Sequence, residues 1–308
     1  MRVLVLGMKE EGPSLPESWR PDCLAALVRL GCSVDVIMFG QLTAEALLER
    51  SVGADLVLWL KDDPKGSPER VVEALREVES RGVVTAGVHL DLFHGIPRRQ
   101  EQVGRLPWWR CQFVFTPDGG PRDWGVVNHR WFPPPFGTRF MRRVRRPDPV
   151  YRSFKAAFVG APVKRLHGSH RFALLEWARR TYGDRFLETG SGGRKAWGWE
   201  LNRLYGSVPL VVSDSAWAPR YWSDRIPRTL GRGGIMAHPL VPGMDEWGLT
   251  DEVLIRYPRG EFEVIRERRE SMTLREVRAM REAAVEVTRR LHSWDAALVR
   301  LFGEVGLA

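Results

Sequence analysis

Short apolar runs alternate with amphipathic segments through the first 90 residues of this 308-residue chain. Apolar runs of about four to eight residues are typical of strands buried on both faces, and longer segments with apolar positions three and four apart are typical of helices. Their alternation predicts right-handed βαβ units, and hence a parallel sheet with helices on both faces. The expected strands are 1–7, 32–39, 54–60 and 82–90, and the expected helices are 18–31, 43–53 and 67–82.

The same rhythm returns in the second half, after a looser stretch rich in proline that includes two short expected strands, 111–116 and 125–132. Further strands are expected at 155–160, 185–190, 208–213 and 234–239, with helices at 170–183, around 196–207 and from Ser223. The segments 251–257 and 261–270 and a long last helix from about Thr273 to Phe302 close the chain. A chain of this length exceeds what one core usually serves. We therefore predict an α/β protein of two Rossmann-like, doubly wound domains, residues 1–150 and 151–290, with the helix end 291–308 packing back on the first.

Cysteine usage and hydropathy limit the class of protein. Cys23, Cys32 and Cys111 are scattered, which indicates neither a disulfide framework nor a zinc site. No run approaches the roughly 18 apolar residues of a membrane helix, and the first run is too short for a signal peptide. We expect a cytoplasmic protein without a membrane span, and the oligomeric state stays open.

The first loop excludes two common nucleotide sites. GMKEEG, after the first expected strand, lacks the GxGxxG pattern whose glycines let a backbone approach a pyrophosphate, and no GxxxxGK[ST] occurs. Neither a dinucleotide nor a nucleoside triphosphate is therefore expected in the first domain.

The formal net charge of +9 is unevenly spread. Residues 98–146 contain eleven arginines and three acidic residues, interleaved with aromatic side chains. Because arginines contact phosphates and aromatic rings stack on bases, this stretch favours a nucleic-acid surface. The alternatives are aromatics buried between domains, an arginine-rich overall composition, and an anionic lipid head or teichoic-type polymer as partner. The residues expected to touch nucleic acid or acceptor are Arg98, Arg99, Trp108, Trp109, Arg122, Arg130, Arg142 and Arg143.

Residues 221–239, YWSDRIPRTLGRGGIMAHP, combine arginines, glycines and a short apolar run. A helix opening at Ser223 would place Arg225 and Arg228 near its N-terminus, where N–H groups and the helix dipole favour anions. This predicts a phosphate-binding site, and the alternative is a solvent-exposed helix face without a ligand. Gly233 and Gly234 either let the backbone approach a ligand or simply end the helix.

Several segments resemble the GT-B glycosyltransferases, especially the bacterial and phage "group 1" and spore-maturation-like members. In the second half they are KAAFVGAPVKR, LYGSVPLVVSDS, AHPLVPGMDEWG, DEVLIRYPRGEFEVI and LHSWDAALVRLF, and in the first half HLDLFHGIPRR, FVFTPDGG and GVVNHRWFPP. The resemblance implies two Rossmann-like domains facing across a cleft, with a nucleotide-sugar, most commonly a UDP-sugar, in the C-terminal domain. It also implies an acceptor on the N-terminal domain and no required metal, which agrees with the absence of any Asp-x-Asp.

A nucleotide-sugar needs cations at its diphosphate, because the leaving group gains negative charge. The residues expected to bind the donor are Lys164, Arg165, Gly190, Trp197, Ser223, Arg225, Arg228, Gly233, Gly234, Asp245 and Glu246. Among these, Trp197 would stack on the base, with a place in the core as its alternative, and the two acidic residues would hold sugar hydroxyls. The chain departs from the family at Arg228, where many relatives place a ribose-binding Glu, and at Arg220, where some carry another.

Transfer of a sugar to a hydroxyl group requires a base that removes the proton of the acceptor hydroxyl. Asp91 is the best candidate, because it follows the strand 82–90 at the edge where open α/β sheets bind ligands, and His89 and His94 could assist or replace it. The alternatives for His89, Asp91 and His94 are a structural role in capping the loop and a metal site.

These features predict a glycosyltransferase whose acceptor is a hydroxymethylated base in DNA, flipped out of the helix for reaction. Two alternatives stay open. One is transfer to a cell-surface polymer or small molecule, and the other is a non-catalytic nucleic-acid-binding protein on a transferase scaffold.

Overall fold

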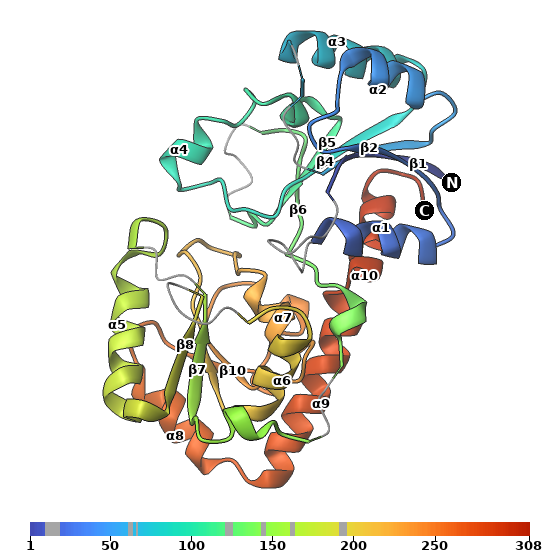
Figure 1. Ribbon diagram of the computed structural model, residues 1–308. Helices are drawn as coiled ribbons and strands as arrows, with labels where there is room; N and C mark the ends of the chain where they lie inside the picture. The colour runs from blue at the N-terminus through green and yellow to red at the C-terminus, as the bar shows by residue number, and fades with distance from the viewer. Residues whose placement is uncertain are drawn as a thin grey trace. The chain divides into compact units, whose positions relative to one another are not determined.

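A computed structural model of the protein describes residues 1–9, 19–60, 64–65, 67–120, 126–142, 146–160, 164–190 and 196–308, without the side chains of 164–168. The chain forms two compact units (Figure 1). The first consists of Met1–Pro133 together with Trp294–Ala308, and the second is Pro134–Ser293. The division comes earlier than residue 150, and the second unit is inserted into the first.

The first unit is built on a six-stranded sheet of order β2-β1-β3-β4-β5-β6, in which every neighbouring pair is parallel. Its strands are β1 (Arg2–Met8), β2 (Ser33–Met38), β3 (Leu56–Leu60), β4 (Val84–Val88), β5 (Phe113–Thr116) and β6 (His129–Trp131). Its helices are α1 (Trp19–Arg29), α2 (Ala44–Arg50), α3 (Pro68–Ser80), α4 (Pro97–Gln100), the 3-10 turn η1 (Pro107–Arg110) and α10 (Trp294–Glu304). This confirms the predicted alternation of strands and helices.

Successive side chains of a strand point to opposite faces of the sheet, and β1 shows how both faces are covered. Val3 and Val5 pack into one hydrophobic cluster with residues of α1 and α10. Leu4 and Leu6 pack into a second cluster with residues of α2 and α3, on the opposite face (Figure 1). The first unit is therefore doubly wound, with a core on each side of one sheet.

The second unit holds a five-stranded parallel sheet of order β11-β10-β9-β7-β8. Its strands are β7 (Ala156–Val159), β8 (Phe186–Thr189), β9 (Val211–Val212), β10 (Met236–Pro239) and β11 (Ile255–Tyr257). Its helices are α5 (Lys164–Tyr182), α6 (Trp199–Ser207), α7 (Arg225–Leu230), α8 (Glu263–Ser271) and α9 (Leu274–Leu291). One core cluster lies between the sheet and α5 and α8, and another between the sheet and α6. Both units are Rossmann-like.

The prediction of a single final helix from Thr273 to Phe302 is wrong, because α9 ends at Leu291 and α10 begins at Trp294. Between them the carbonyl of His292 accepts the N–H of Phe136 at 2.8 Å, and Ser293 forms a β-bridge with Phe136. These contacts hold the two ends of the inserted unit together. Beyond them the chain returns to the first unit, where α10 packs on α1.

Trp294 tests how far the first unit depends on α10. Its side chain is fully buried and stacks on Trp19, with ring centroids 5.7 Å apart. We expect Trp294→Ala to lower the free energy of unfolding by about 3–5 kcal/mol, because it leaves a large cavity. Val299→Ala is the matched control on the exposed face of the same helix and should change stability by less than about 0.5 kcal/mol. Urea denaturation followed by tryptophan fluorescence measures both, and equal effects would contradict the expectation.

Candidate active site

Two aspartates lie just past the carboxyl ends of neighbouring strands of the first sheet. Asp91 follows β4 and Asp118 follows β5. Asp91 has 42% of its side chain exposed, and its Oδ1 lies 3.5 Å from Nη2 of Arg99. Asp118 is buried. Since open α/β sheets bind ligands at this edge, Asp91 is placed to meet a substrate.

His89 is buried beneath this edge rather than presented on it. Its ring stacks on Trp108, with centroids 5.1 Å apart, and lies edge-on to Phe93. Its Nδ1 accepts the backbone N–H of Asp91 at 3.0 Å, so Nδ1 carries no proton and its lone pair is occupied. Asp91 and the half-buried His94 are therefore the predicted base candidates that a substrate can reach. Within the described residues, no group of three or more His, Cys, Asp or Glu side chains is arranged to hold a metal ion.

The aromatic part of the predicted nucleic-acid surface is corrected by the structure. Trp108 and Trp109 are 1% and 3% exposed and stack on each other, with centroids 4.6 Å apart. Both belong to a hydrophobic cluster of the first unit, so neither can stack on a base. These two rings are buried, as the alternative expected, but in the core of the first unit itself rather than between domains, and they stabilise that unit from within.

The predicted arginines are divided between the two units. In the first unit, Arg98 is exposed and Arg99 lies beside Asp91. Nε of Arg130 lies 3.6 Å from Oε2 of Glu304. In the second unit, Arg142 is exposed and its guanidinium lies over the Trp199 ring. Arg122 and Arg143 lie outside the described residues.

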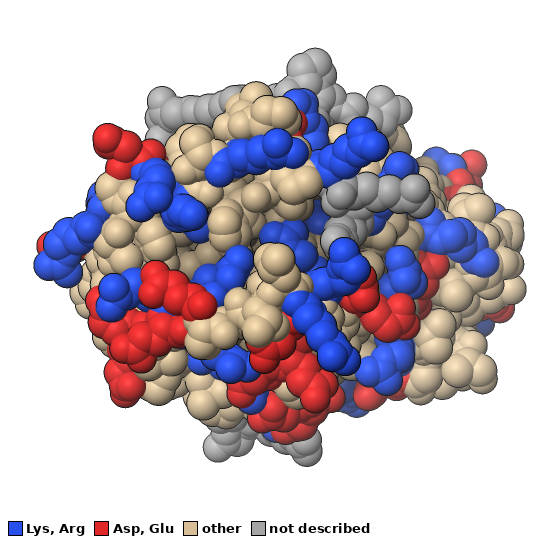
Figure 2. Space-filling view, turned by 90° about the horizontal axis from the view of Figure 1, so that it is seen from below, with Lys and Arg blue, Asp and Glu red and all other residues tan. Residues whose placement is uncertain are grey.

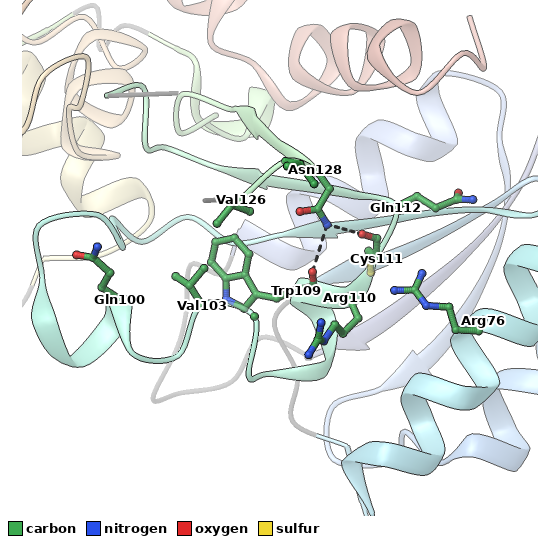
Figure 3. Close-up of a pocket in the computed structure, with 11 residues that line it drawn as sticks. Arg76, Gln100, Val103, Trp109, Arg110, Cys111, Gln112, Val126 and Asn128 are labelled. Atoms are coloured by element: carbon green, nitrogen blue, oxygen red, sulfur yellow. Dashed lines mark hydrogen bonds between the residues drawn. The ribbon is translucent and has the colours of Figure 1, made fainter. Parts of the chain in front are cut away.

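An open pocket of about 680 Å³ lies in the first unit (Figure 3). Cys111 precedes β5 and Asn128 precedes β6, so the pocket is at the amino edge of the sheet, opposite to Asp91. The Asn128 amide donates to the Cys111 carbonyl at 2.6 Å, which ties the two segments together. Arg76 extends from α3 toward the segment that carries Arg110, and both also line a neighbouring hollow of about 430 Å³. The hollows are lined by both signs of charge, because Glu69 and Glu73 also line the second one and Arg76 pairs with Glu79.

Elsewhere the surface charge is mixed. Figure 2 shows a face on which Lys and Arg side chains are interspersed with Asp and Glu. On α8 and α9, exposed arginines pair with glutamates three residues away, as Arg266 does with Glu263 and Arg289 with Glu286. Such pairs contribute little stability and cancel the local field.

A buried charged cluster occupies the carboxyl edge of the second sheet. Asp214, two residues past β9, is fully buried, and its Oδ1 accepts from Nε of the buried Arg171 at 2.6 Å. Nδ1 of His170 lies 3.8 Å from its Oδ2. Burial alone would raise the pKa of the Asp214 carboxyl, but His170, Arg171 and Arg225 outweigh burial and hold the pKa below its ordinary value. The carboxylate therefore stays ionised at neutral pH.

Arg225 lies across the ends of two strands in this cluster. Its Nη2 donates to the Asp214 carbonyl at 2.7 Å, and its Nε contacts the Ser223 hydroxyl at 3.3 Å. Gly160, at the end of β7, has φ +150°, and a Cβ there would lie 2.7 Å from Nη1 of Arg225. A larger residue at position 160 would strain the backbone at this φ and would displace the guanidinium. A Cβ on Gly190, after β8, would likewise come within about 3.0 Å of the Gly160 backbone.

The helix after Ser223 differs from the expected phosphate-binding site. It begins at Arg225, with Asp224 as N-cap, and has only six residues. Its two arginines diverge, because Arg225 reaches Asp214 whereas Nη1 of Arg228 donates to the Asp224 carboxylate at 3.1 Å. The guanidinium of Arg225, rather than a helix N-terminus, therefore provides the positive charge at this edge.

The remaining residues predicted to bind the nucleotide-sugar donor lie in several parts of the second unit. Gly233 and Gly234 are buried before β10, at the amino edge, where a Cβ on Gly234 would meet Thr229. Asp245 and Glu246 are exposed and pair with Arg256 and Arg220, each at 2.6 Å. Trp197 is 37% exposed, in the segment that follows β8. The side chains of Lys164 and Arg165, at the start of α5, are not described.

Sequence reasoning gave no role to Gly160, Asp118, Asp214 or Arg171. Gly160 is the last residue of the expected strand 155–160, and Asp118 and Asp214 follow the expected strands 111–116 and 208–213 within two residues, so the rule that singled out Asp91 applies to them as well. Arg171 carries no such signal, because it lies within a helix and reaches the cluster only through the tertiary fold.

Solved structures match this arrangement over nearly the whole chain. An alpha-glucosyltransferase in complex with UDP and a 13-mer DNA containing an HMU base matches with TM-score 0.67 and 10% identity over 99% of each chain. The protein has the GT-B fold. HepE from Anabaena in complex with UDP-glucose matches with TM-score 0.59 and 10% identity over both chains in full. A glycosyltransferase from Rickettsia africae matches with TM-score 0.63 and 7% identity over 99% of this chain and 97% of its own.

No protein-family model and no curated protein matches the sequence, so the solved structures carry the assignment of the GT-B fold that the sequence segments suggested. Among the described residues of this GT-B protein, no helix is both long and apolar enough to cross a membrane.

A buried histidine beside the charged cluster predicts a pH dependence of stability. His238 is fully buried, and its Nδ1–H donates to the Pro239 carbonyl. Burial lowers the pKa of His238 to about 4, against 6.5 for an ordinary histidine. Because the unfolded chain binds more protons between these values, the stabilisation is complete above about pH 6.5 and is lost as the pH falls toward 4.

We expect His238→Gln to remove part of the acid sensitivity of this GT-B protein. On acidification from pH 7 to pH 5, the free energy of unfolding of the wild type should fall by on the order of 2 kcal/mol more than that of the variant. Urea denaturation at the two pH values measures the difference. Equal losses in the two proteins would contradict the assignment.

Proposed function

We propose that this protein is a glycosyltransferase that moves a sugar from a UDP-sugar to a hydroxyl group of an acceptor. The match of both units to GT-B proteins with bound UDP or UDP-glucose carries the proposal. The two carboxyl edges supply complementary chemistry, since the second unit offers buried cationic groups and the first offers an accessible carboxylate. The donor would bind to the second unit and the acceptor to the first.

Arg225 is the group proposed to bind the donor diphosphate. When the bond between the sugar C1 and the diphosphate breaks, its electron pair passes to the diphosphate, and a cation held in place stabilises that charge. Arg225 has 14% of its side chain exposed, and contacts with Asp214 and Ser223 fix its position. Trp197, Gly190 and the N-terminal residues of α5 are proposed to complete the nucleotide site.

We expect Arg225→Gln to weaken UDP binding roughly 10-fold to 100-fold, because it removes charge-assisted hydrogen bonds. Isothermal titration of UDP measures the affinity. Arg289→Gln, an exposed arginine of α9, is the matched control and should bind UDP as the wild type does. Unchanged affinity in Arg225→Gln would remove this residue from the donor site.

The reaction also requires a proton acceptor, and Asp91 is proposed to supply it. As the acceptor oxygen bonds to C1 of the sugar, its proton passes to the Asp91 carboxylate. The neighbouring Arg99 guanidinium, 3.5 Å away, favours the ionised carboxylate that this role needs. We propose that no metal is required, because arginine supplies the positive charge, and transfer that persists in excess EDTA would support this.

A hydroxymethylated base in DNA is the proposed acceptor. One similar protein was solved with UDP and DNA containing an HMU base. In this chain the exposed Arg98, which lies in α4 after the Asp91 loop, is proposed to contact DNA phosphates. Arg105 and Arg110 line the hollows at the amino edge, opposite to Asp91. Because Trp108 and Trp109 are buried, such recognition would rest on phosphate contacts rather than on stacking by these rings.

We expect the wild type to transfer radiolabelled sugar from a UDP-sugar to a duplex containing hydroxymethylated pyrimidines, and not to an unmodified duplex. Asp91→Asn should lower kcat by about 100-fold to 10,000-fold while UDP affinity is retained, because only proton removal is lost. Scintillation counting of recovered DNA measures transfer.

The same assay separates the alternatives. Transfer to a polysaccharide or small molecule, but not to DNA, would assign a different acceptor. Salt-sensitive DNA binding with no affinity for any UDP-sugar would identify a non-catalytic binding protein on a GT-B scaffold.

A further inference from the structure

Side chains hold the backbone of the loop that carries Asp91. Oδ1 of Asp118 accepts two consecutive N–H groups, from Phe93 at 2.9 Å and from His94 at 2.7 Å. Asp118 lies past β5 and the loop past β4, so the contact joins the ends of two neighbouring strands. Hydrogen bonds to a charged acceptor are stronger than those between neutral groups.

The other side of the loop is held in the same way. Nδ1 of His89 accepts the Asp91 N–H at 3.0 Å, and Nη1 of Arg99 donates to the Leu92 carbonyl at 2.9 Å. Each residue from 91 to 94 therefore gives one backbone group to a side chain from another position. The Asp91 carboxylate itself stays 42% exposed.

Asp118 is in turn fixed by the residues around it. It is 5% exposed, and its Oδ2 accepts the Thr116 hydroxyl proton. Because Thr116 has only that proton, its oxygen accepts from Nε2–H of His129, at 2.9 Å. Burial lowers the pKa of His129 to about 4, so this ring is neutral at pH 7. The chain from His129 through Thr116 leaves the Asp118 carboxylate a single orientation.

We propose that Asp118 is a positioning residue, which holds the loop 91–94 so that the Asp91 carboxylate meets the acceptor hydroxyl in a reactive geometry. This inference rests on the proposed function, in which Asp91 removes the acceptor proton. A base that is displaced by about 1 Å can lose on the order of 100-fold in rate, so loss of the carboxylate should act on catalysis without touching substrate. Donor binding, which belongs to the second unit, should be unaffected.

Two substitutions separate the geometry from the charge. Asp118→Ala removes both backbone hydrogen bonds. Asp118→Asn keeps an Oδ1 that accepts both N–H groups. Its amide can donate to Thr116 if the hydroxyl proton turns to His129 and the neutral imidazole takes the Nδ1–H tautomer, so that Nε2 accepts. We expect Asp118→Ala to lower kcat on the order of 100-fold with UDP affinity unchanged, and Asp118→Asn to stay within a few-fold of the wild type.

Hydrogen–deuterium exchange of the peptide that contains Phe93 and His94 gives a readout independent of activity. We expect exchange of these amides to be at least about 10-fold faster in Asp118→Ala and nearly unchanged in Asp118→Asn. If Asp118→Ala does not fold, Thr116→Val replaces it, and it should give smaller changes in the same direction because Oδ2 loses its donor.

The outcomes are distinct. Wild-type exchange in the Ala variant, or faster exchange with an unchanged kcat, would overturn the positioning role. Equal losses of activity in the Ala and Asn variants would do the same, because geometry would then not be the cause. A wild type that transfers no sugar from any UDP-sugar would refute the proposed function, while the exchange experiment would still decide whether Asp118 holds the loop.

Discussion

Strands that are buried on both faces can present polar chemistry only where they end. The residues of β3, Leu56–Leu60, are all fully buried, and most of the neighbouring strands are nearly as apolar. Since parallel strands end at one edge, the functional groups of each unit gather there. The same constraint produces the pair Asp91 and Asp118 in the first unit and the pair Gly160 and Asp214 in the second.

The charged groups at the carboxyl edges of the two sheets are arranged differently. In the second unit, burial and the nearby Arg225 lower the pKa of Arg171 to about 10, and Asp214 offsets part of this cost. A single carboxylate thus lets two guanidiniums lie close together, and their excess positive charge suits the proposed binding of the donor diphosphate. In the first unit, the buried Asp118 binds N–H groups, and the charge left for chemistry is the exposed Asp91. Both edges are organised before any substrate arrives, which lowers the reorganisation that the reaction would need.

Periodicity was enough to predict the fold, because buried strands and amphipathic helices have patterns that tertiary contacts seldom override. It was not enough for the break at His292, where the helical pattern of the sequence continues although the backbone carbonyl bonds to Phe136, which is distant in the sequence. For the site, the strand-end rule found Asp91 but could not distinguish a buried support such as Asp118 from an exposed group. Composition likewise could not show that Trp108 and Trp109 lie in the core. Burial depends on which segments pack against each other in the folded chain, and a single sequence does not give those contacts.

The insertion of the second unit between Pro133 and Trp294 has a consequence for synthesis. A ribosome makes the strands of the first unit early, yet the face that includes Val3 and Val5 remains uncovered until Leu298 and Leu301 have emerged. The inserted unit, whose ends are hydrogen-bonded to each other, can fold in the meantime. The half of the protein that is translated first is therefore the last to complete its core, because that core needs the residues of α10.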